Sequence, residues 1–278
     1  MIFLAAAHLA AAPAEADDDL LEHVIVTATR RSIDMTEVAA AISTVDSETA
    51  ISHKLTTDAL QSLPGVYLQQ TTPGQGAAII RGLKGSAILH LVDGMRLSNA
   101  MFRTAPTPWF ALVPATSVER LEVVRGTPAS LYGSEAVGGV VQSVSRLPEF
   151  DSEEVGYKRD FLVGFDTAEL QKSIRATLDF GTQRLAASVS AEYLETGDRR
   201  TGGGERIGPS GYTSKALRTV VHGTPNDYRS WFVDLQFLEQ PKTPRVDELV
   251  AGFGQDEPSS SEFFFEPNLR IFAHVQHD

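Results

Sequence analysis

The C-terminal part of the chain, from about residue 155 onward, repeats one pattern that restricts its fold more than any other feature. Apolar and polar side chains alternate there with a period of two, most clearly in residues 173–180, 185–193, 231–237 and 269–275. Successive side chains of a β-strand point to opposite faces of the sheet, so each segment predicts a strand with one apolar and one polar face. Soluble antiparallel sandwiches and transmembrane β-barrels both contain such strands, and the membrane signal of a single strand is weak. The alternation alone leaves the two architectures open.

The middle of the chain, residues 36–148, combines short helical and strand signals with glycine-containing turns. A helical signal at residues 56–63 places Leu60 and Leu63 on one face and ends at Pro64. The other predicted elements are strands at residues 66–68, 77–80, 88–92 and 119–124, a helical turn at residues 127–131 and a last strand that begins within residues 137–141. This mixture predicts an α+β domain of ordinary size.

The first 16 residues are apolar and rich in alanine, and small residues stand two positions apart at Ala12, Ala14 and Ala16. This composition predicts the apolar core and cleavage region of a secretory signal peptide. No Lys or Arg precedes Arg30, so the basic start of such a peptide is missing and an unrelated apolar segment stays the alternative. The stretch is shorter than the ~20 apolar residues that a membrane-spanning helix needs.

Overall composition excludes several classes of function. The formal net charge of -12 disfavours a nucleic-acid partner, because phosphate binding needs a basic surface. The chain has no cysteine, which excludes disulfides and thiolate metal sites. No paired carboxylates or Gly-x-Ser-x-Gly motif is present, so we predict no enzyme, no cofactor and no bound metal. His90 lies within an apolar strand signal and is interpreted as a structural residue.

Five motifs in residues 23–145 occur in the order typical of one known family. They are VIVTA at 24–28, LQSLPGV at 60–66, IRG at 80–82, LVDGMRL at 91–97, and the stretch ERLEVVRG, LYGS and AVGGV within 119–140. Together they resemble the plug domain of TonB-dependent outer-membrane receptors. The resemblance implies that residues 36–148 form a plug, and that residues 149–278 form strands of the β-barrel that surrounds it.

Residues 17–35 are expected to form a flexible tail, because their short β-prone run has no second strand signal nearby. The run resembles the family's TonB box, which consists here of Val24, Ile25, Val26, Thr27 and Ala28. Such a box adds as an extended strand to the sheet edge of the periplasmic energy-transducing protein TonB, which then pulls on it. The alternative is that the run is a short strand of the plug.

The resemblance also implies roles for plug residues. Arg81 and Arg125 are expected to face the barrel wall and pair with acidic residues, and Glu119 and Glu122 are further candidates for plug–barrel contacts. Six glycines are expected at tight turns of the plug: Gly82, Gly94, Gly126, Gly133, Gly138 and Gly139. The candidates for ligand contact at the plug apex are Gln75, Met101, Phe102 and Arg103.

The length of the C-terminal part limits the barrel. The family encloses its plug in about 22 strands, whereas residues 149–278 provide for about six at roughly 10 residues per membrane strand. We therefore expect an α+β plug domain followed by antiparallel β-strands of an incomplete transmembrane β-barrel, as in a truncated, split or fragmentary receptor. An open sheet in lipid leaves edge backbone groups unsatisfied, so such a fragment is expected to be inactive alone.

The resemblance implies a function for the parent protein. We expect a receptor of the cell outer membrane that takes up an iron chelate, haem or cobalamin, with TonB as its partner and a small molecule as its ligand. A soluble exported β-rich binding protein is the alternative, and it predicts a closed sandwich after residue 150.

Overall fold

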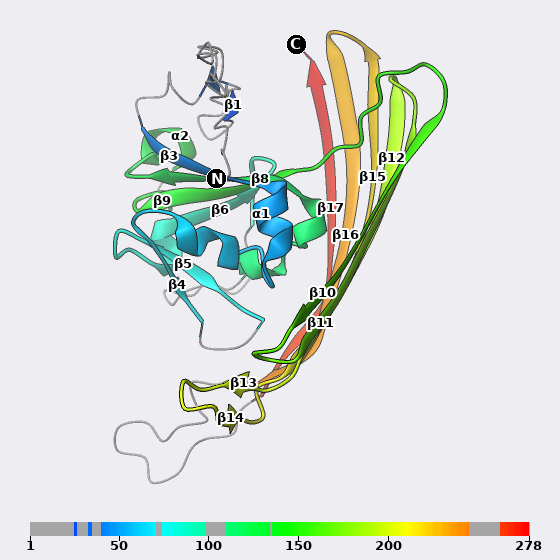
Figure 1. The fold of residues 1–278 in the computed structure, drawn as a ribbon. Helices are drawn as coiled ribbons and strands as arrows, with labels where there is room; N and C mark the ends of the chain where they lie inside the picture. Colours follow the sequence, from blue (N-terminus) through cyan, green and yellow to red (C-terminus); the bar gives the residue numbers. More distant parts are fainter. Residues whose placement is uncertain are drawn as a thin grey trace, which may run out of the picture.

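In the computed structural model, an α+β domain lies against the concave face of one long, curved antiparallel sheet (Figure 1). The structure describes residues 25–26, 33–34, 40–70, 74–97, 109–133, 135–244 and 262–277. The predicted signal peptide, Val24, Thr27, Ala28 and the ligand candidates Met101, Phe102 and Arg103 lie outside these residues.

A five-stranded sheet forms the centre of the α+β domain. Its strands are β3 (Ala41–Asp46), β8 (Val118–Arg125), β9 (Gly139–Ser145), β6 (Ile88–Val92) and β7 (Met95–Arg96), adjacent in that order. All neighbours are antiparallel except β6 and β9, which run parallel. A separate hairpin pairs β4 (Val66–Gln69) with β5 (Ala77–Ile80). The predicted strands of the middle region are thus present, with β3 and β7 in addition.

Short helices connect these strands. They are α1 (Ser47–Ser52), η2 (Asp58–Ser62), η3 (Gly85–Ala87), η4 (Trp109–Leu112), η5 (Ala115–Ser117) and α2 (Ala129–Tyr132). The predicted helix at residues 56–63 is the shorter 3-10 helix η2. The sequence did not reveal α1, because six residues are too few to show a helical period. Its start is capped by Asp46, whose Oδ1 accepts a hydrogen bond of 2.7 Å from the Thr49 amide. No helix in the described parts of the chain is long and apolar enough to span a membrane.

The hydrophobic core connects the domain to the long sheet. Leu60, Ile80 and Leu121 of the domain are fully buried, and their cluster also contains Val220 and Phe232 from the long sheet. Burial of side chains of this size contributes about 1.5–3 kcal/mol each. The two layers therefore share one core at this point.

The predicted turn glycines have two kinds of environment. Gly82, Gly94, Gly126, Gly133 and Gly139 have positive φ. At Gly139 a Cβ atom would lie 2.5 Å from the carbonyl oxygen of Val124, so β9 approaches β8 too closely there for any side chain. Gly138 is not among the positive-φ residues, but a Cβ atom there would lie 2.7 Å from Leu83 and Ile88. Close packing requires glycine at Gly138.

The long sheet has six antiparallel strands in sequence order. They are β10 (Gly156–Asp166), β11 (Gln171–Gly181), β12 (Leu185–Thr196), β15 (Tyr212–Asn226), β16 (Arg229–Pro244) and β17 (Glu262–His277). The connection between β12 and β15 carries a small hairpin of β13 (Arg199–Arg200) and β14 (Arg206–Ile207). The four alternating segments of the sequence lie within β11, β12, β16 and β17.

The burial of the two sheet faces decides between the two architectures. In β11 the polar residues Ser173, Arg175 and Asp179 are buried against the α+β domain. The apolar residues Ile174 and Phe180 are 47% and 46% exposed on the other face. A soluble sandwich buries its apolar face, whereas a barrel in a membrane turns its apolar face outward to lipid. The soluble alternative is therefore wrong, and the sheet has the character of a barrel wall.

The expectation that the β-prone run at Ile25 and Val26 has no partner strand was wrong. Ile25 and Val26 form β1, which pairs antiparallel with β2 (Ile33–Asp34), although the sequence indicated no partner strand nearby. The partner is only two residues long, and one of them is Asp34, so it carries no recognisable strand pattern.

Candidate functional site

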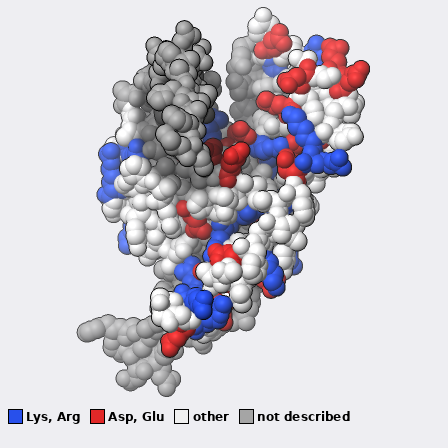
Figure 2. All heavy atoms as spheres, viewed as in Figure 1, with Lys and Arg blue, Asp and Glu red and all other residues white. Residues whose placement is uncertain are grey.

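The two ends of the long sheet differ in the length of their connections. Short turns at residues 182–184 and 227–228 join strands at one end, which we call the short-turn end. Residues 197–211 and 245–261 make longer connections at the other end, which we call the long-loop end. On the face shown in Figure 2, charged side chains of both signs gather along the junction of the two layers. That junction is the candidate site.

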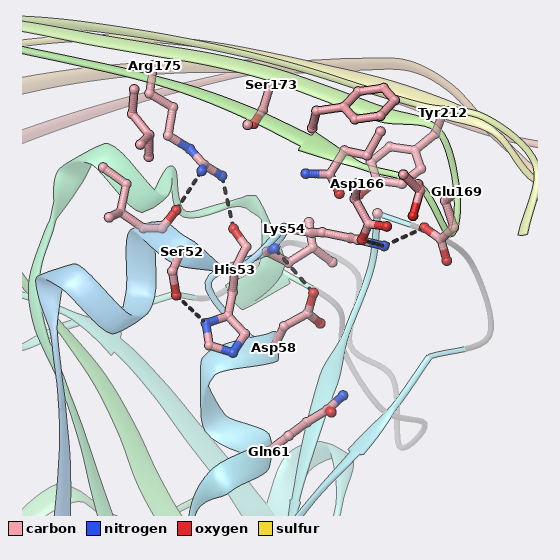
Figure 3. A pocket seen from close by; sticks show the side chains of 18 of the residues that line it. Ser52, His53, Lys54, Asp58, Gln61, Asp166, Glu169, Ser173, Arg175 and Tyr212 are labelled. Carbon is pink, nitrogen blue, oxygen red and sulfur yellow. Dashed lines mark hydrogen bonds and ion pairs between the residues drawn. The ribbon is translucent and has the colours of Figure 1, made fainter.

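A cleft of about 990 Å³ opens between the α+β domain and the long-loop end (Figure 3). On one side it is lined by α1, the loop after α1 and η2. On the other side it is lined by the ends of β10 and β11, the turn between them, and Arg199 and Tyr212. Polar and charged groups thus converge on one opening.

Lys54, in the loop after α1, crosses the cleft. Its Nζ lies 2.7 Å from Oε2 of Glu169 and 3.6 Å from Oδ2 of Asp166, both at the β10–β11 turn. The side chains of Lys54 and Glu169 are 28% and 18% exposed, so water screens this pair and its contribution is about 1 kcal/mol or less. The pair links the α+β domain to the long sheet, and it is weak enough for the two to separate at this point.

Asp58, at the start of η2, is the most buried carboxylate of the cleft on the domain side. Burial raises its pKa, and hydrogen bonds from the Leu55 amide (3.3 Å) and from Nε2 of Gln70 (2.7 Å) act in the opposite direction. Gln70 also accepts a hydrogen bond of 3.1 Å from Nη2 of Arg199 on β13. A hydrogen-bonded chain therefore runs from the long-loop end into the domain.

Arg175 makes a buried charged contact between the layers. It extends from β11, is 4% exposed, and donates to the carbonyl oxygens of Ile51 (2.5 Å) and His53 (3.0 Å). Its Nε lies 3.4 Å from Glu192 of β12. A buried guanidinium is tolerated only when it is paired and hydrogen-bonded, so these contacts hold the end of α1 against the wall.

Further contacts lie toward the short-turn end. Arg146, just after β9, binds both carboxylate oxygens of Asp179 on β11. His222 of β15 contacts the carbonyl oxygen of Pro148 at 3.3 Å through Nδ1. Together with the apolar contacts of Val220 and Phe232, they anchor the domain near the start of the long sheet.

The long sheet also carries a buried ion pair of its own. Arg218 donates from Nε and Nη2 to Oδ2 of Asp234, at 2.9 and 2.7 Å, and Gln236 donates to the same oxygen at 3.0 Å. Gln240, further along β16, donates to the carbonyl oxygen of Gly74 in the domain at 3.0 Å. Polar side chains of the inner face of the wall therefore bond partly to one another and partly to the domain.

The four predicted plug–barrel residues lie elsewhere. Arg125 donates to the carbonyl oxygen of Pro64 at 2.9 Å, and Arg81 is exposed in the turn after β5. Glu122 is fully buried and lies 2.8 Å from Nε of Arg120 on the same strand. Glu119 is exposed. The contacts described here for Arg125 and Glu122 are within the domain, and the roles of all four at a barrel wall stay predictions.

Gln75 and His90, the two remaining candidates among the described residues, are both buried. Gln75 is buried beside Gly74, and Gly74 lines the cleft. Burial lowers the pKa of His90 to about 4, and its ring lies 5.5 Å from that of Phe110, so the imidazole is neutral and packed in the core. Within the described ranges, no group of three or more His, Cys, Asp or Glu is arranged to hold a metal ion.

The residues that cross the junction were not predicted from the sequence. Arg175 and Asp179 could have been found, because they occupy polar positions of an alternating strand whose other face is apolar. Lys54 and Arg146 lie in irregular segments, where no pattern in the sequence distinguishes an interface residue from a solvated one.

Comparison with known proteins decides the family. Residues 34–140, which contain the five-stranded sheet except residues 141–145 of β9, match the family described as the TonB-dependent Receptor Plug Domain. Residues 34–140 are a TonB-dependent receptor plug domain, and similarity to a transporter of this kind extends over 87% of the chain. The α+β domain is accordingly the plug, and the long sheet matches part of the receptor barrel.

Two relatives and one solved structure illustrate the extent of the similarity. The vitamin B12 transporter BtuB of Vibrio vulnificus (strain YJ016) is 33% identical over 252 residues, which are 87% of this chain and 38% of the relative. The iron-regulated outer membrane virulence protein of Vibrio cholerae (serotype O1, strain O395) is 36% identical over 132 residues, which are 45% of this chain and 20% of the relative. The structure of the FpvAI–pyocin S2 complex contains a chain with a TM-score of 0.63 at 14% identity, covering 90% of this chain and 33% of that one.

These matches confirm the predicted family and fold. TonB-dependent receptors are outer-membrane proteins and are not enzymes. The chain spans about two fifths of the length of the vitamin B12 transporter that it matches over most of its own residues.

Proposed function

We propose that the complete receptor takes up a bulky nutrient across the outer membrane, and that the nutrient is an iron chelate, haem or cobalamin. The observation that carries the proposal is the polar junction between plug and wall. A plug held by screened pairs such as Lys54–Glu169 beside a cleft at the long-loop end can be displaced without unfolding the barrel. Long loops of such barrels face the outside, so the cleft opens toward incoming ligand.

Cobalamin is the first ligand to test. The relative that aligns with 87% of this chain is named as a vitamin B12 transporter. The iron-regulated relative matches only 45% of the chain, so its similarity gives less support to an iron chelate as the ligand. Gln75, Met101, Phe102 and Arg103 remain the proposed ligand contacts on the plug.

Energy for transport is proposed to come from TonB through residues 24–28. Ile25 and Val26 pair with only the two residues of β2. A two-stranded hairpin of this length is marginal in water, so the same residues can exchange this pairing for the sheet edge of a partner. The proposed domain limits are a signal peptide at 1–16, a tail at 17–35, the plug at 36–148 and barrel strands from 149.

Further barrel strands are needed for transport. Among the described strands, β10 and β17 are the two edges of the long sheet. Hydrocarbon does not satisfy the free backbone groups of a sheet edge. Of the proposed plug contacts, Arg81, Arg125 and Glu119 would meet the strands that close the barrel, whereas Glu122 is already buried beside Arg120. A polypeptide restricted to residues 1–278 is therefore proposed to be inactive in uptake.

The test is a binding and uptake assay with the complete receptor. Outer-membrane vesicles that contain it are mixed in turn with radiolabelled cyanocobalamin, haemin and ferric siderophores, and uptake is measured in cells with and without TonB. The proposal predicts that one of these ligands is bound and that its uptake is lost without TonB. Binding of none of them, or uptake that does not depend on TonB, contradicts it.

A further inference from the structure

A chain of hydrogen bonds leads from the β13–β14 hairpin into the plug. Arg199 of β13 donates from Nη2 to Oε1 of Gln70 at 3.1 Å, and Gln70 donates from Nε2 to Oδ1 of Asp58 at 2.7 Å. The other oxygen of Asp58 accepts from the Leu55 amide at 3.3 Å. This path ends in the plug loop between α1 and η2.

A second path joins the same two segments. Lys54, directly before Leu55, lies 2.7 Å from Oε2 of Glu169, and Oε1 of Glu169 lies 3.6 Å from Nε of Arg199. The two paths share Arg199 at one end and the loop of residues 54–55 at the other. They therefore form a closed ring that crosses between plug and barrel twice, beside the cleft of Figure 3.

On the barrel side, several hydrogen bonds hold the base of the β13–β14 hairpin, which carries Arg199. Oδ1 of Asp198 accepts from the amides of Ser210 (2.7 Å) and Gly211 (3.0 Å), and the Arg199 amide donates to Oγ of Ser210 at 2.7 Å. The Gly197 amide donates to the carbonyl oxygen of Glu169 at 2.7 Å. Arg199 and Glu169 consequently move as one body with the base of the hairpin.

The hairpin itself projects past the long-loop end of the sheet (Figure 1). Its tip is exposed, and among the described residues Arg200 bonds within the hairpin, to the carbonyl oxygen of Gly204 at 3.3 Å. Any molecule that approaches the cleft from this end can contact the hairpin before it reaches the plug.

We propose that Arg199 couples the β13–β14 hairpin to residues 53–62, a plug loop that comprises the segment after α1 together with η2. Displacement of the hairpin then loosens this loop. Each contact of the ring is partly exposed and weak when taken singly. Without Arg199 the path through Gln70 is broken and the Glu169 carboxylate loses its contact with the hairpin, so of the two crossings of the ring only Lys54–Glu169 remains. Coupling of this kind is reciprocal, so loosening the plug loop must also loosen the hairpin.

Hydrogen exchange of the complete receptor in detergent micelles tests the coupling without any ligand. Arg199→Gln keeps a side chain of similar length and removes the charge. We expect about tenfold faster exchange in peptides that cover residues 53–62, which corresponds to about 1.4 kcal/mol of local stability. Exchange in β8 and β9 should stay unchanged, which shows that the plug remains folded.

Arg200→Gln is the matched control, since it removes the same charge from the neighbouring residue outside the ring. It should leave residues 53–62 at the exchange rate of the unmodified receptor. Equal rates for Arg199→Gln and Arg200→Gln in this loop would overturn the proposal.

Lys54→Gln tests the reverse direction. It should accelerate exchange in peptides covering residues 197–211, on the barrel side, although the substitution is in the plug. If exchange in residues 197–211 stays at the original rate while the plug loop loosens, the two segments are not coupled and the proposal fails. Neither readout depends on transport, so failure here is distinct from failure of the proposed function.

Discussion

Arg146 and Asp179 form a two-pronged ion pair between the end of the plug and the second strand of the barrel wall. Nη1 of Arg146 lies 3.1 Å from Oδ1 of Asp179, and Nη2 contacts Oδ2. The carboxylate is 2% exposed and the guanidinium 25%. Because Arg146 follows directly after β9, this pair joins the plug to the wall at the point where the chain passes from one to the other.

Arg146→Ala should loosen the plug, because it leaves the buried Asp179 carboxylate without its main donor. Hydrogen bonds to charged groups contribute about 1.5–3 kcal/mol, and a loss of that size is expected. The measurement is the urea midpoint of plug unfolding, followed by hydrogen exchange in β9. Arg184→Ala serves as the control, since Arg184 is exposed in a turn of the same wall and should leave the midpoint unchanged.

Gly139→Ala should destabilise the plug more than Gly82→Ala. Both glycines have positive φ, at 155° and 81°, so alanine is strained at either position. At Gly139 a Cβ atom would also meet the Val124 carbonyl oxygen at 2.5 Å, whereas nothing lies within 4 Å at Gly82. We expect a loss of about 1 kcal/mol for Gly82→Ala and distinctly more for Gly139→Ala. Equal losses in denaturant unfolding would show that the close approach of β9 to β8 is absent.

The plug should lose stability as the pH falls from about 6.5 to 4. Burial holds the pKa of His90 at about 4 in the folded plug, below the ordinary value of 6.5. The unfolded chain therefore binds a proton in this window while the folded plug does not, and stability is full above pH 6.5. The complete change is about 3 kcal/mol. His90→Leu should flatten the dependence of plug unfolding on pH in this window; an unchanged slope would assign it to other groups.

Ile25→Pro should abolish cross-linking of the receptor to TonB. Proline lacks the amide hydrogen that a strand donates to its partner's edge, so it blocks β-augmentation at this position. Ile25→Val is the control, since it keeps the backbone donor and β propensity, and cross-linking should persist. Retention of cross-linking in the proline variant would reject residues 24–28 as the TonB box.

The sequence predicted the regular parts of the fold well, for identifiable reasons. The period-two alternation of β11, β12, β16 and β17 reports directly which face each side chain occupies. β10 was not resolved by this pattern, because Lys158, Arg159 and Asp160 follow one another on both faces. The sequence also left open which face is buried, since sandwich and barrel alternate alike; burial of Arg175 and Asp179 supplied the answer.

Much less of the site could be predicted. Its contacts pair residues far apart in the chain, such as Lys54 with Glu169 and Gln70 with Arg199. Side chains in irregular loops have no period that places them on a face, so only the folded arrangement of plug and wall brings them together. The family motifs direct attention to Arg81 and Arg125, whose contacts with a barrel wall remain to be tested.

The most direct test of the account uses two adjacent residues of β12. Val189 is 38% exposed on the outer face, and Ser190 is 3% exposed against the plug side. Residues 1–278 contain no cysteine, so once any cysteine elsewhere in the receptor is replaced by serine, Val189→Cys and Ser190→Cys each carry one nitroxide label in outer-membrane vesicles. The account predicts that oxygen dissolved in the lipid relaxes the label at residue 189 strongly, that a water-soluble nickel chelate does not, and that the label at residue 190 responds weakly to both. Strong relaxation by the nickel chelate at residue 189, or lipid contact at residue 190, would contradict a plug enclosed by a membrane wall.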